Sequence, residues 1–140
     1  MPSSTVEDYV KAIHLIADRA GTDRPVETGE IAAALGVSSS TVTRRLQSLA
    51  RSKLVFYTPN KGARLTGAGQ RLALRVLRRH RRWELFLARV LGLSWDEVHA
   101  EAEHLEHAAS ERLINRIDAY LGHPTIDPHD DPVPGADGGP

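Results

Sequence analysis

The short spacing between two helical segments constrains the fold of this chain most strongly. Residues 28–35 and residues 39–52 both carry apolar side chains at helical spacing, and only Gly36, Val37 and Ser38 separate them. Glycine can end the first helix in a left-handed conformation, and serine can cap the second helix. Two short helices joined by so tight a turn predict a helix-turn-helix.

The segments on either side extend this motif. Residues 54–58 (LVFYT) and 63–66 (ARLT) are rich in strand-forming residues and flank a Pro-Asn-Lys-Gly turn, so they predict a β-hairpin. Upstream, residues 4–20 have the apolar spacing of a helix, which Ser4 or Thr5 can cap. A helix-turn-helix followed by a two-stranded hairpin is a winged helix, and this is the fold predicted for the first half.

Three further helices are expected after the hairpin, over residues 67–91, 95–110 and 110–122. The expected fold class is therefore mainly α, with a winged helix-turn-helix domain over residues 1–72 and an all-helical domain over residues 73–123. Residues 124–140 are rich in proline, glycine and aspartate, which predicts an extended or disordered tail.

The residue composition sets limits on function. The chain of 140 residues is 41% hydrophobic, enough for a packed core, and has no cysteine. Disulfides and thiolate ligands are therefore excluded, and a metal site would use nitrogen and oxygen donors. The sequence shows neither a signal peptide nor an apolar run of about 18 residues. Neither secretion nor membrane spanning is indicated, and a cytoplasmic protein is expected.

The net charge of zero conceals two oppositely charged halves. Residues 1–82 hold 15 Lys and Arg against 6 Asp and Glu, whereas residues 83–140 hold 3 against 12. From Arg44 to Arg82 there are 12 basic residues and no acidic one. This distribution favours a polyanion as the partner of the first half over two solvated faces that attract each other. For the acidic half, a solvated surface and a cation site both remain open.

The predicted winged helix indicates that this polyanion is double-stranded DNA. The second helix of a helix-turn-helix enters the major groove with its N-terminal residues near base edges. Arg44 can make a bidentate contact with guanine, while basic residues of the wing, Lys53 among them, lie near phosphates. A capped surface helix with basic tips is the simpler alternative. The residues predicted to contact DNA are Ser38, Ser39, Ser40, Thr41, Thr43, Arg44, Arg45, Lys61 and Arg64.

Histidine and glutamate cluster on the helix expected over residues 95–110. Helical geometry places four of them within an arc of about 100°. These four are His99, Glu103, Glu106 and His107. Glu101 and His104 fall outside the arc, whereas His80 and Glu84 share one face of the preceding helix. Imidazole and carboxylate donors together suit Mn, Fe, Co, Ni or Zn, so a divalent-metal site is predicted, with solvated side chains as the simpler alternative.

Enzymatic sites fit these residues less well. A zinc-protease helix needs His-Glu-x-x-His, whereas the chain has His104-Leu-Glu-His107. The Glu-x-x-His motif of di-iron carboxylate proteins occurs once, at Glu101 to His104, where two copies are needed. The sequence has no cysteine nucleophile and no Gly-x-Ser-x-Gly elbow. The chain is therefore not expected to be an enzyme.

Four stretches of the sequence carry a family resemblance: EDYVKAIHLI at 7–16, EIAAALGVSSSTVTRRLQSL at 30–49, LTGAGQRLALRVLRRHRRWELFL at 65–87 and VHAEAEHLEH at 98–107. Together they resemble the diphtheria-toxin-repressor family of metal-dependent transcriptional repressors, in the branch of the manganese transport regulators. DPVPG at 131–135 resembles the segment that follows the family's dimerisation helices. The resemblance implies a winged helix-turn-helix DNA-binding domain followed by an all-helical dimerisation and metal-binding domain.

The resemblance also implies two metal sites. The residues that match the primary, regulatory site are Asp8, Glu103, Glu106 and His107. Those that match the ancillary site of the iron-responsive branch are His80, Glu84 and His99. Iron-type members of the family carry sulfur residues where this chain has Asp8 and Glu103, and manganese-type members carry carboxylates. Oxygen-rich, sulfur-free ligation favours Mn²⁺, with Fe²⁺ as the alternative and other divalent transition metals as substitutes.

Two features depart from the family pattern. Lys11 stands where the manganese branch has a second glutamate, which favours two separated ions over a close binuclear pair. Longer relatives carry a C-terminal SH3-like domain that supplies further ancillary ligands, whereas this sequence stops at Pro140. Water or another carboxylate would then complete the ancillary site.

The expected function is that of a metal-activated, dimeric, DNA-binding transcriptional regulator that controls metal homeostasis by repressing metal uptake genes. An ion held by Asp8 and by residues 103–107 would link the two domains and set the spacing of the two recognition helices on a palindromic operator. The expected partners are therefore DNA and a second copy of the chain, and no membrane. A metal-independent winged-helix regulator that responds to a small organic effector is the alternative.

Overall fold

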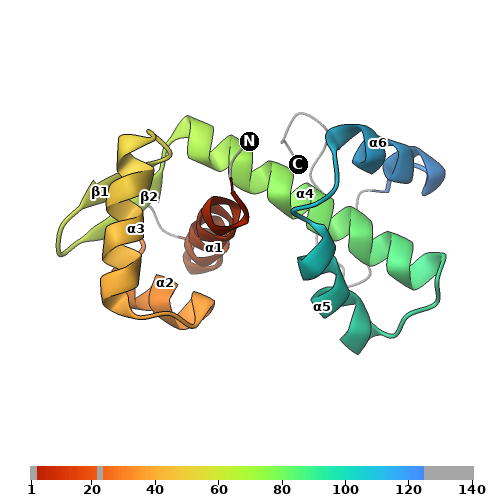
Figure 1. Cartoon of the computed structure of the whole chain (residues 1–140), viewed down its shortest axis with the longest axis horizontal. Helices are drawn as coiled ribbons and strands as arrows, with labels where there is room; N and C mark the ends of the chain where they lie inside the picture. The colour runs from red at the N-terminus through yellow and green to blue at the C-terminus, as the bar shows by residue number, and fades with distance from the viewer. Residues whose placement is uncertain (1–2, 22–23, 125–140) are drawn as a thin grey trace. The chain divides into compact units, whose positions relative to one another are not determined.

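The computed structural model describes residues 3–21 and 24–124, which form six α-helices and one two-stranded sheet (Figure 1). The chain divides into two units, Met1–Ala73 and Leu74–Pro140, and the division falls inside the longest helix. The predicted fold class, mainly α with a winged helix first, is confirmed. Apart from Pro124, the tail predicted over residues 124–140 lies outside the described residues.

The helices of the first unit begin at well-defined caps. Ser3 caps α1 (Ser4–Ala20) by accepting a hydrogen bond from the backbone N–H of Val6 at 3.2 Å, so the predicted caps Ser4 and Thr5 are wrong by one or two residues. Glu27 precedes α2 (Thr28–Leu35) and forms a capping box with Glu30. A glutamate pair thus replaces the more common Ser or Thr cap that sequence reasoning looks for.

The turn into the second helix of the motif matches the prediction. Gly36 has φ +67°, the left-handed conformation that ends α2. Ser38 then caps α3 (Ser39–Arg51) by accepting from the backbone N–H of Thr41 at 3.2 Å. The turn between the two helices is therefore fixed at both of its ends.

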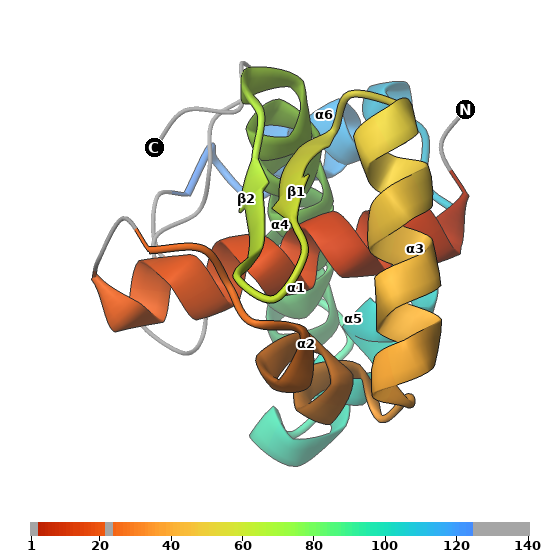
Figure 2. The same ribbon diagram turned by 90° about the vertical axis from the view of Figure 1, so that its left-hand side faces the viewer.

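The wing is an antiparallel hairpin of β1 (Val55–Thr58) and β2 (Gly62–Leu65), and Figure 2 shows it beside α3. The register pairs Val55 with Leu65 and Thr58 with Gly62. Gly62 has φ +119°, and a Cβ there would lie 2.1 Å from the carbonyl oxygen of Val26. Glycine is required at this position because the chain before α2 forms a β-bridge with Ala63, which brings its backbone against the wing.

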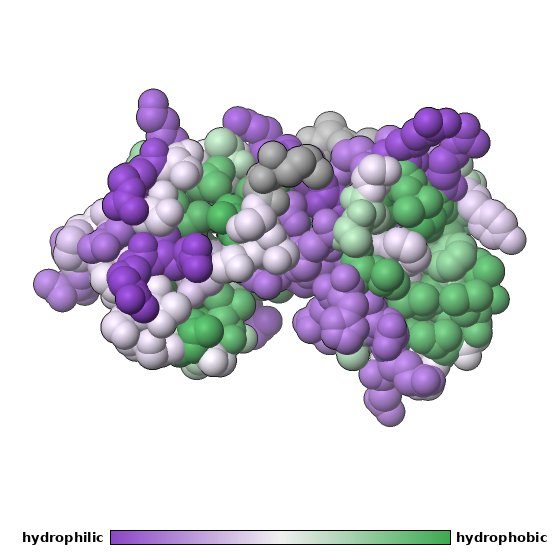
Figure 3. All heavy atoms as spheres, viewed as in Figure 1, coloured by the Kyte–Doolittle hydropathy of each residue, from purple (hydrophilic) through white to green (hydrophobic). Residues whose placement is uncertain are grey.

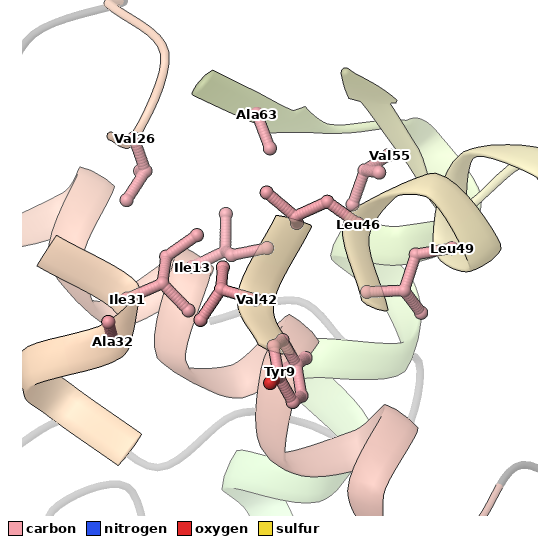
Figure 4. Packing of buried hydrophobic residues seen from close by; sticks show 10 residues of the cluster. All are labelled: Tyr9, Ile13, Val26, Ile31, Ala32, Val42, Leu46, Leu49, Val55 and Ala63. Atoms are coloured by element: carbon pink, nitrogen blue, oxygen red, sulfur yellow. The ribbon is translucent and has the colours of Figure 1, made fainter. Parts of the chain in front are cut away.

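The core of the first unit lies between α1, α2, α3 and the hairpin (Figure 4). The predicted inward face of α3 is confirmed, because Val42 and Leu46 are fully buried and Leu49 is 2% exposed. All members of the cluster except one are aliphatic, as the low aromatic content requires. The cluster consists of Tyr9, Ile13, Val26, Ile31, Ala32, Val42, Leu46, Leu49, Val55 and Ala63.

The second unit contains most of α4 (Gly67–Arg89), together with α5 (Trp95–Leu105) and α6 (Glu111–Tyr120). Ser94 and Glu97 form a capping box at the start of α5. This helix ends five residues before the predicted position 110, because residues 106–108 form a turn and Ser110 caps α6. No helix in the described part of the chain is long and apolar enough to cross a membrane.

Charged side chains are unusually abundant in the interior of the second unit. Its buried apolar residues are Val76, Leu77, Leu85, Leu87, Val98, Ala102, Ala109, Ile114 and Ile117. Its buried charged and polar residues are Arg78, Arg79, His80, Arg82, Glu84, Glu106 and Asp118. Buried charges are retained only when they are paired or bind an ion, so these seven side chains indicate where the chemistry of this unit lies.

Candidate metal centre and DNA interface

Donor atoms of three residues converge in the second unit, two residues from one turn of α4 and one from α5. His80 Nε2 lies 3.2 Å from His99 Nδ1 and 3.4 Å from Glu84 Oε1. His99 Nδ1 lies 3.5 Å from the other carboxylate oxygen of Glu84, Oε2. We call His80, Glu84 and His99 the triangle. The helical spacing of four residues places His80 and Glu84 on one face of α4, and both are fully buried. The structure thus brings together the three residues predicted for the ancillary site.

These separations fit a shared metal ion. Two ligands that each lie about 2.0–2.2 Å from an ion, at the 90–110° angles of octahedral or tetrahedral coordination, are roughly 2.8–3.6 Å apart. The three separations between these residues fall within this range, with Glu84 contributing Oε1 toward His80 and Oε2 toward His99. Two imidazole nitrogens and one carboxylate oxygen are also the donor types that bind first-row divalent metals.

Glu84 is held in its anionic form. Burial alone would raise the pKa of this carboxyl group, but the hydrogen bond and charge of His80 and the neighbouring Arg81 outweigh that effect and lower the pKa to about 2. Arg81 Nη1 lies 3.1 Å from Glu84 Oε1. At neutral pH the Glu84 carboxyl group is therefore an anion, the form in which it can bind a divalent cation.

The outer nitrogen of each histidine faces a further carboxylate. His80 Nδ1 lies 2.7 Å from Glu106 Oε2, and His99 Nε2 lies 3.0 Å from Glu103 Oε1. The other oxygen of Glu106, Oε1, lies 3.4 Å from His107 Nε2. Histidines that bind metals commonly donate their second N–H to a carboxylate, which fixes the ring orientation.

The residues predicted for the primary site come from α1, from α5 and from the turn that follows α5. Glu106 is 1% exposed and follows the last residue of α5, with His107 next to it. Glu103 is half exposed and lies beside His99. Asp8 lies on α1 in the first unit. The single helical arc predicted for residues 99–107 is therefore split, because α5 ends at Leu105 and Glu106 turns inward.

The two residues excluded from the arc are exposed. Glu101 and His104 both lie on the solvent side of α5. Their exposure follows from the helical period, since Ala102 and Leu105 occupy the inward side of the same turns. Neither residue belongs to the triangle.

The first turn of α3 faces solvent, as expected of a recognition helix. Ser39, Ser40 and Arg44 are exposed, while Thr41, Thr43 and Arg45 are partly buried. The hydroxyl of Ser38 donates to Thr41 Oγ1 at 2.8 Å, and that of Thr43 donates to the carbonyl of Ser39 at 3.1 Å. Of the predicted set, Ser38, Ser40, Thr41 and Thr43 therefore have hydroxyl groups engaged in hydrogen bonds at the start of the helix. Lys53, Lys61 and Arg64 are exposed around the hairpin.

The sequence did not lead us to predict that arginines of α4 pair with residues of α6 inside the second unit. Arg78 donates to Asn115 Oδ1 at 2.8 Å, Arg79 pairs with Glu111 at 3.1 Å, and Arg82 lies 2.5 Å from Asp118. These arginines belong to the acid-free stretch that we assigned to a polyanion, but their partners lie on α6. These arginines lie within about one helical turn of each other, in a chain whose other half is acidic. This pattern was the signal that could have revealed their internal partners.

A winged helix followed by a helical unit with a histidine and carboxylate triangle defines a class of metal-responsive DNA-binding proteins, and comparisons with known proteins agree. Residues 1–63 match the family model "Iron dependent repressor, N-terminal DNA binding domain". Residues 66–135 match "Iron dependent repressor, metal binding and dimerisation domain". The chain belongs to the iron-dependent repressor family, which confirms the resemblance inferred from the sequence.

Individual relatives in this family are named for iron or for manganese. The iron-dependent repressor IdeR of Mycobacterium leprae is 36% identical over 131 residues, covering 94% of this chain and 56% of the relative. The structure of a manganese-dependent transcriptional repressor in complex with manganese is 48% identical with a TM-score of 0.85, covering 94% and 59%. The manganese regulator SloR is 35% identical with a TM-score of 0.81, covering 94% and 60%. The chain thus spans less than two thirds of each of these relatives.

Proposed function

We propose that this protein is a metal-activated, dimeric, DNA-binding transcriptional regulator that represses metal uptake genes. The observation that carries the proposal is the triangle of His80, Glu84 and His99, in a chain whose first unit is a winged helix. Donor atoms of these three residues lie 3.2–3.5 Å apart, with Glu84 facing His80 through Oε1 and His99 through Oε2. A candidate metal site and a winged-helix domain are therefore combined in one chain.

Mn²⁺ is the metal we propose, with Fe²⁺ as the alternative. The chain has no cysteine and a single methionine, Met1, so every candidate ligand is an imidazole or a carboxylate. Such donors suit the harder Mn²⁺ better than metals that prefer sulfur. The relative named as manganese-dependent is 48% identical, whereas the one named as iron-dependent is 36% identical.

We assign two sites, following the family resemblance. The triangle would form the ancillary site, and the primary site would use Asp8, Glu103, Glu106 and His107. Because Asp8 comes from the DNA-binding domain, an ion at the primary site would favour the DNA-binding conformation by its higher affinity for it. The metal would then act as an effector and not as a catalyst.

The DNA-binding surface would consist of the exposed start of α3 and the basic residues of the wing. Arg44 is the residue best placed in the sequence to read guanine, since it is exposed one turn into the recognition helix. Lys61 and Arg64 would contact phosphates from the wing. Two such surfaces in a dimer would bind two half-sites of a palindromic operator.

An apolar surface of the second unit suits dimerisation. Val90, Leu91 and Trp95 are 42%, 58% and 56% exposed, and Figure 3 shows apolar side chains gathered over the end of α4. Exposed apolar patches of this kind mark protein–protein contacts. The matched family model describes this part of the chain as a dimerisation domain.

The proposal is tested by DNA binding with and without metal. DNA sequences would be selected from a random pool by the purified protein in Mn²⁺, and the selected duplex used in gel shifts with Mn²⁺, with Fe²⁺ under anaerobic conditions and with chelator. We expect binding with metal and weak binding with chelator. Asp8→Ala should abolish the metal response while retaining the circular dichroism spectrum of the wild type. Equal binding with Mn²⁺ and with chelator would refute metal activation.

A further inference from the structure

The outward face of α3 extends beyond the residues predicted to contact DNA, and its next member is Gln47. We infer that Gln47 reads an adenine in the base pair next to the guanine that Arg44 contacts. The inference rests on the proposed function, since it assumes that α3 enters the major groove of an operator. It adds a specificity-determining residue to that function and specifies part of the sequence that the protein recognises.

Four residues share the side of α3 that faces away from the core. Figure 4 shows Val42, Leu46 and Leu49 among the clustered side chains of the core. Residues at positions i, i+3, i+4 and i+7 on the other side lie within an arc of about 100°. Recognition helices of homeodomains read bases with this same spacing. On α3 these positions are Ser40, Thr43, Arg44 and Gln47, of which all but the partly buried Thr43 are exposed.

Internal hydrogen bonds occupy the two hydroxyl groups of this face. The Thr43 hydroxyl donates to the carbonyl oxygen of Ser39 at 3.1 Å. The Ser40 hydroxyl lies 3.1 Å from that of Ser38, which in turn donates its proton to Thr41 Oγ1 at 2.8 Å. Ser40 is therefore the donor of its pair. The protons of both hydroxyl groups are thus committed within α3, and these small residues contribute mainly room for a close approach to DNA.

Arg44 and Gln47 are the members of the face whose hydrogen-bonding groups are free. Within the described part of the chain, neither side chain has a hydrogen bond or an ion pair. Both are exposed. Donation of hydrogen bonds to base edges from this face therefore depends on these two side chains.

The amide of Gln47 matches one base of the four. It carries an acceptor and a donor side by side, and adenine presents an acceptor at N7 and a donor at N6 in the major groove. Guanine presents two acceptors there, thymine an acceptor and a methyl group, and cytosine a donor. Adenine alone pairs with both halves of the amide.

The separation of Gln47 from Arg44 sets the distance between the two bases. Three residues of an α-helix rise about 4.5 Å, and successive base pairs of DNA rise about 3.4 Å. Two side chains one helical turn apart therefore reach neighbouring base pairs when the helix lies along the groove. We expect each half-site to contain a guanine and an adenine at adjacent base pairs.

Two substitutions at position 47 test this assignment. Gln47→Ala removes both hydrogen-bonding groups of the amide. Gln47→Glu keeps the size of the side chain but offers only acceptors, which suit the N4 donor of cytosine. Position 47 is exposed and both new residues are good helix formers, so the variants should fold, and their circular dichroism spectra check this. The control is Lys61→Ala, which removes an exposed charge of the wing.

The first measurement compares the sequences that each full-length protein selects from a random DNA pool in Mn²⁺. The wild type should select an adenine next to a guanine. Gln47→Ala should lose the preference at that adenine alone, by about 5–150-fold, and Gln47→Glu should shift it toward cytosine. Lys61→Ala should select the wild-type sequence and bind it more weakly. A Gln47→Ala variant that selects the wild-type sequence, with or without weaker binding, would overturn the assignment.

The second measurement changes the base instead of the protein. In the selected duplex, 7-deazaadenine replaces the adenine and carries a C–H group in place of N7. The wild type should bind this duplex about 2–10-fold more weakly in fluorescence anisotropy, because one hydrogen bond is lost. Gln47→Ala should bind both duplexes equally. A loss of the same size in the wild type and in Gln47→Ala would show that another group contacts N7 and would overturn the assignment.

The wild-type protein separates this inference from the proposed function. If the wild type selects no sequence in Mn²⁺, or binds the selected duplex equally with chelator, the metal-activated function is refuted. If it binds with metal and selects a sequence without an adenine beside the guanine, the role of Gln47 alone is refuted and metal activation stands.

Discussion

Removal of the Asp118 carboxylate should destabilise the second unit by about 3–5 kcal/mol, the usual cost of breaking a buried ion pair from one side. Asp118 lies on α6 and is 7% exposed. Its Oδ1 lies 2.5 Å from Arg82 Nε, and its Oδ2 lies 3.9 Å from Arg78 Nη2 and 2.6 Å from His123 Nδ1. One carboxylate thus compensates two arginines of α4 that are 3% and 2% exposed.

The magnitude follows from the burial of these arginines. Burial lowers the pKa of the Arg82 guanidinium, an effect that Asp118 opposes and that Arg78 reinforces. Without Asp118 the desolvation of Arg82 remains while its attraction to this carboxylate is lost. Arg78 keeps its bond to Asn115 at 2.8 Å, so the cost falls mainly on Arg82. An exposed pair lacks this penalty and contributes about 0–1 kcal/mol.

Tryptophan fluorescence measures this effect selectively. Both tryptophans, Trp83 and Trp95, lie in the second unit, so urea unfolding followed by their emission reports this unit alone. Protein concentration must be held constant, because the proposed dimerisation would add to the apparent stability. The matched control is Glu111→Ala, which removes a partner of Arg78 and Arg79 that is 44% exposed. An Asp118→Ala variant that costs no more than this control would refute the burial argument.

Three further predictions concern DNA binding, assembly and pH. Arg44→Ala should relax sequence discrimination by about 1–3 kcal/mol in competition gel shifts, whereas Lys61→Ala should weaken binding to all sequences alike. Leu91→Glu should shift the dimer to a monomer in sedimentation experiments, since it places a charge in the apolar patch, while Val37→Glu in the first unit should not. The folded-state pKa of Glu84, lowered from 4.5 to about 2, means that metal-free protein should lose roughly 3 kcal/mol as the pH falls from about 4.5 to 2. The urea midpoint should therefore fall more between pH 5.5 and 3 in the wild type than in Glu84→Gln.

Local sequence signals predicted the winged helix well because they depend on near neighbours. The apolar face of α3 and the caps at Gly36 and Ser38 follow from helical period and backbone preference, and the structure has them where expected. The cap at Glu27 was missed because glutamate rarely serves there, and only its reciprocal bond with Glu30 reveals it. The early end of α5 was missed for a similar reason, since it depends on the start of the next helix at Ser110.

Long-range pairings were predicted less well. Helical period grouped His99 with Glu106, because a regular helix over residues 99–107 places them on one face. In the structure His99 joins His80 of α4, and Glu106 bonds to the other side of that same ring. The packing of α5 against α4 decides which side of the His80 ring each of these residues contacts. The helical repeat within α5 alone does not determine it.

The charge asymmetry of the sequence has two structural origins that net charge alone does not separate. Arg44, Lys61 and Arg64 are exposed in the first unit, where a polyanion can reach them. Arg78 and Arg82 lie in the same acid-free stretch but are buried, and they neutralise carboxylates of α6 instead. Because a guanidinium that compensates a buried carboxylate cannot also release counterions from DNA, the attraction to phosphates depends on the first unit. The acidic half is correspondingly less negative than its sequence indicates, since arginines of α4 offset part of the charge that α6 contributes to it.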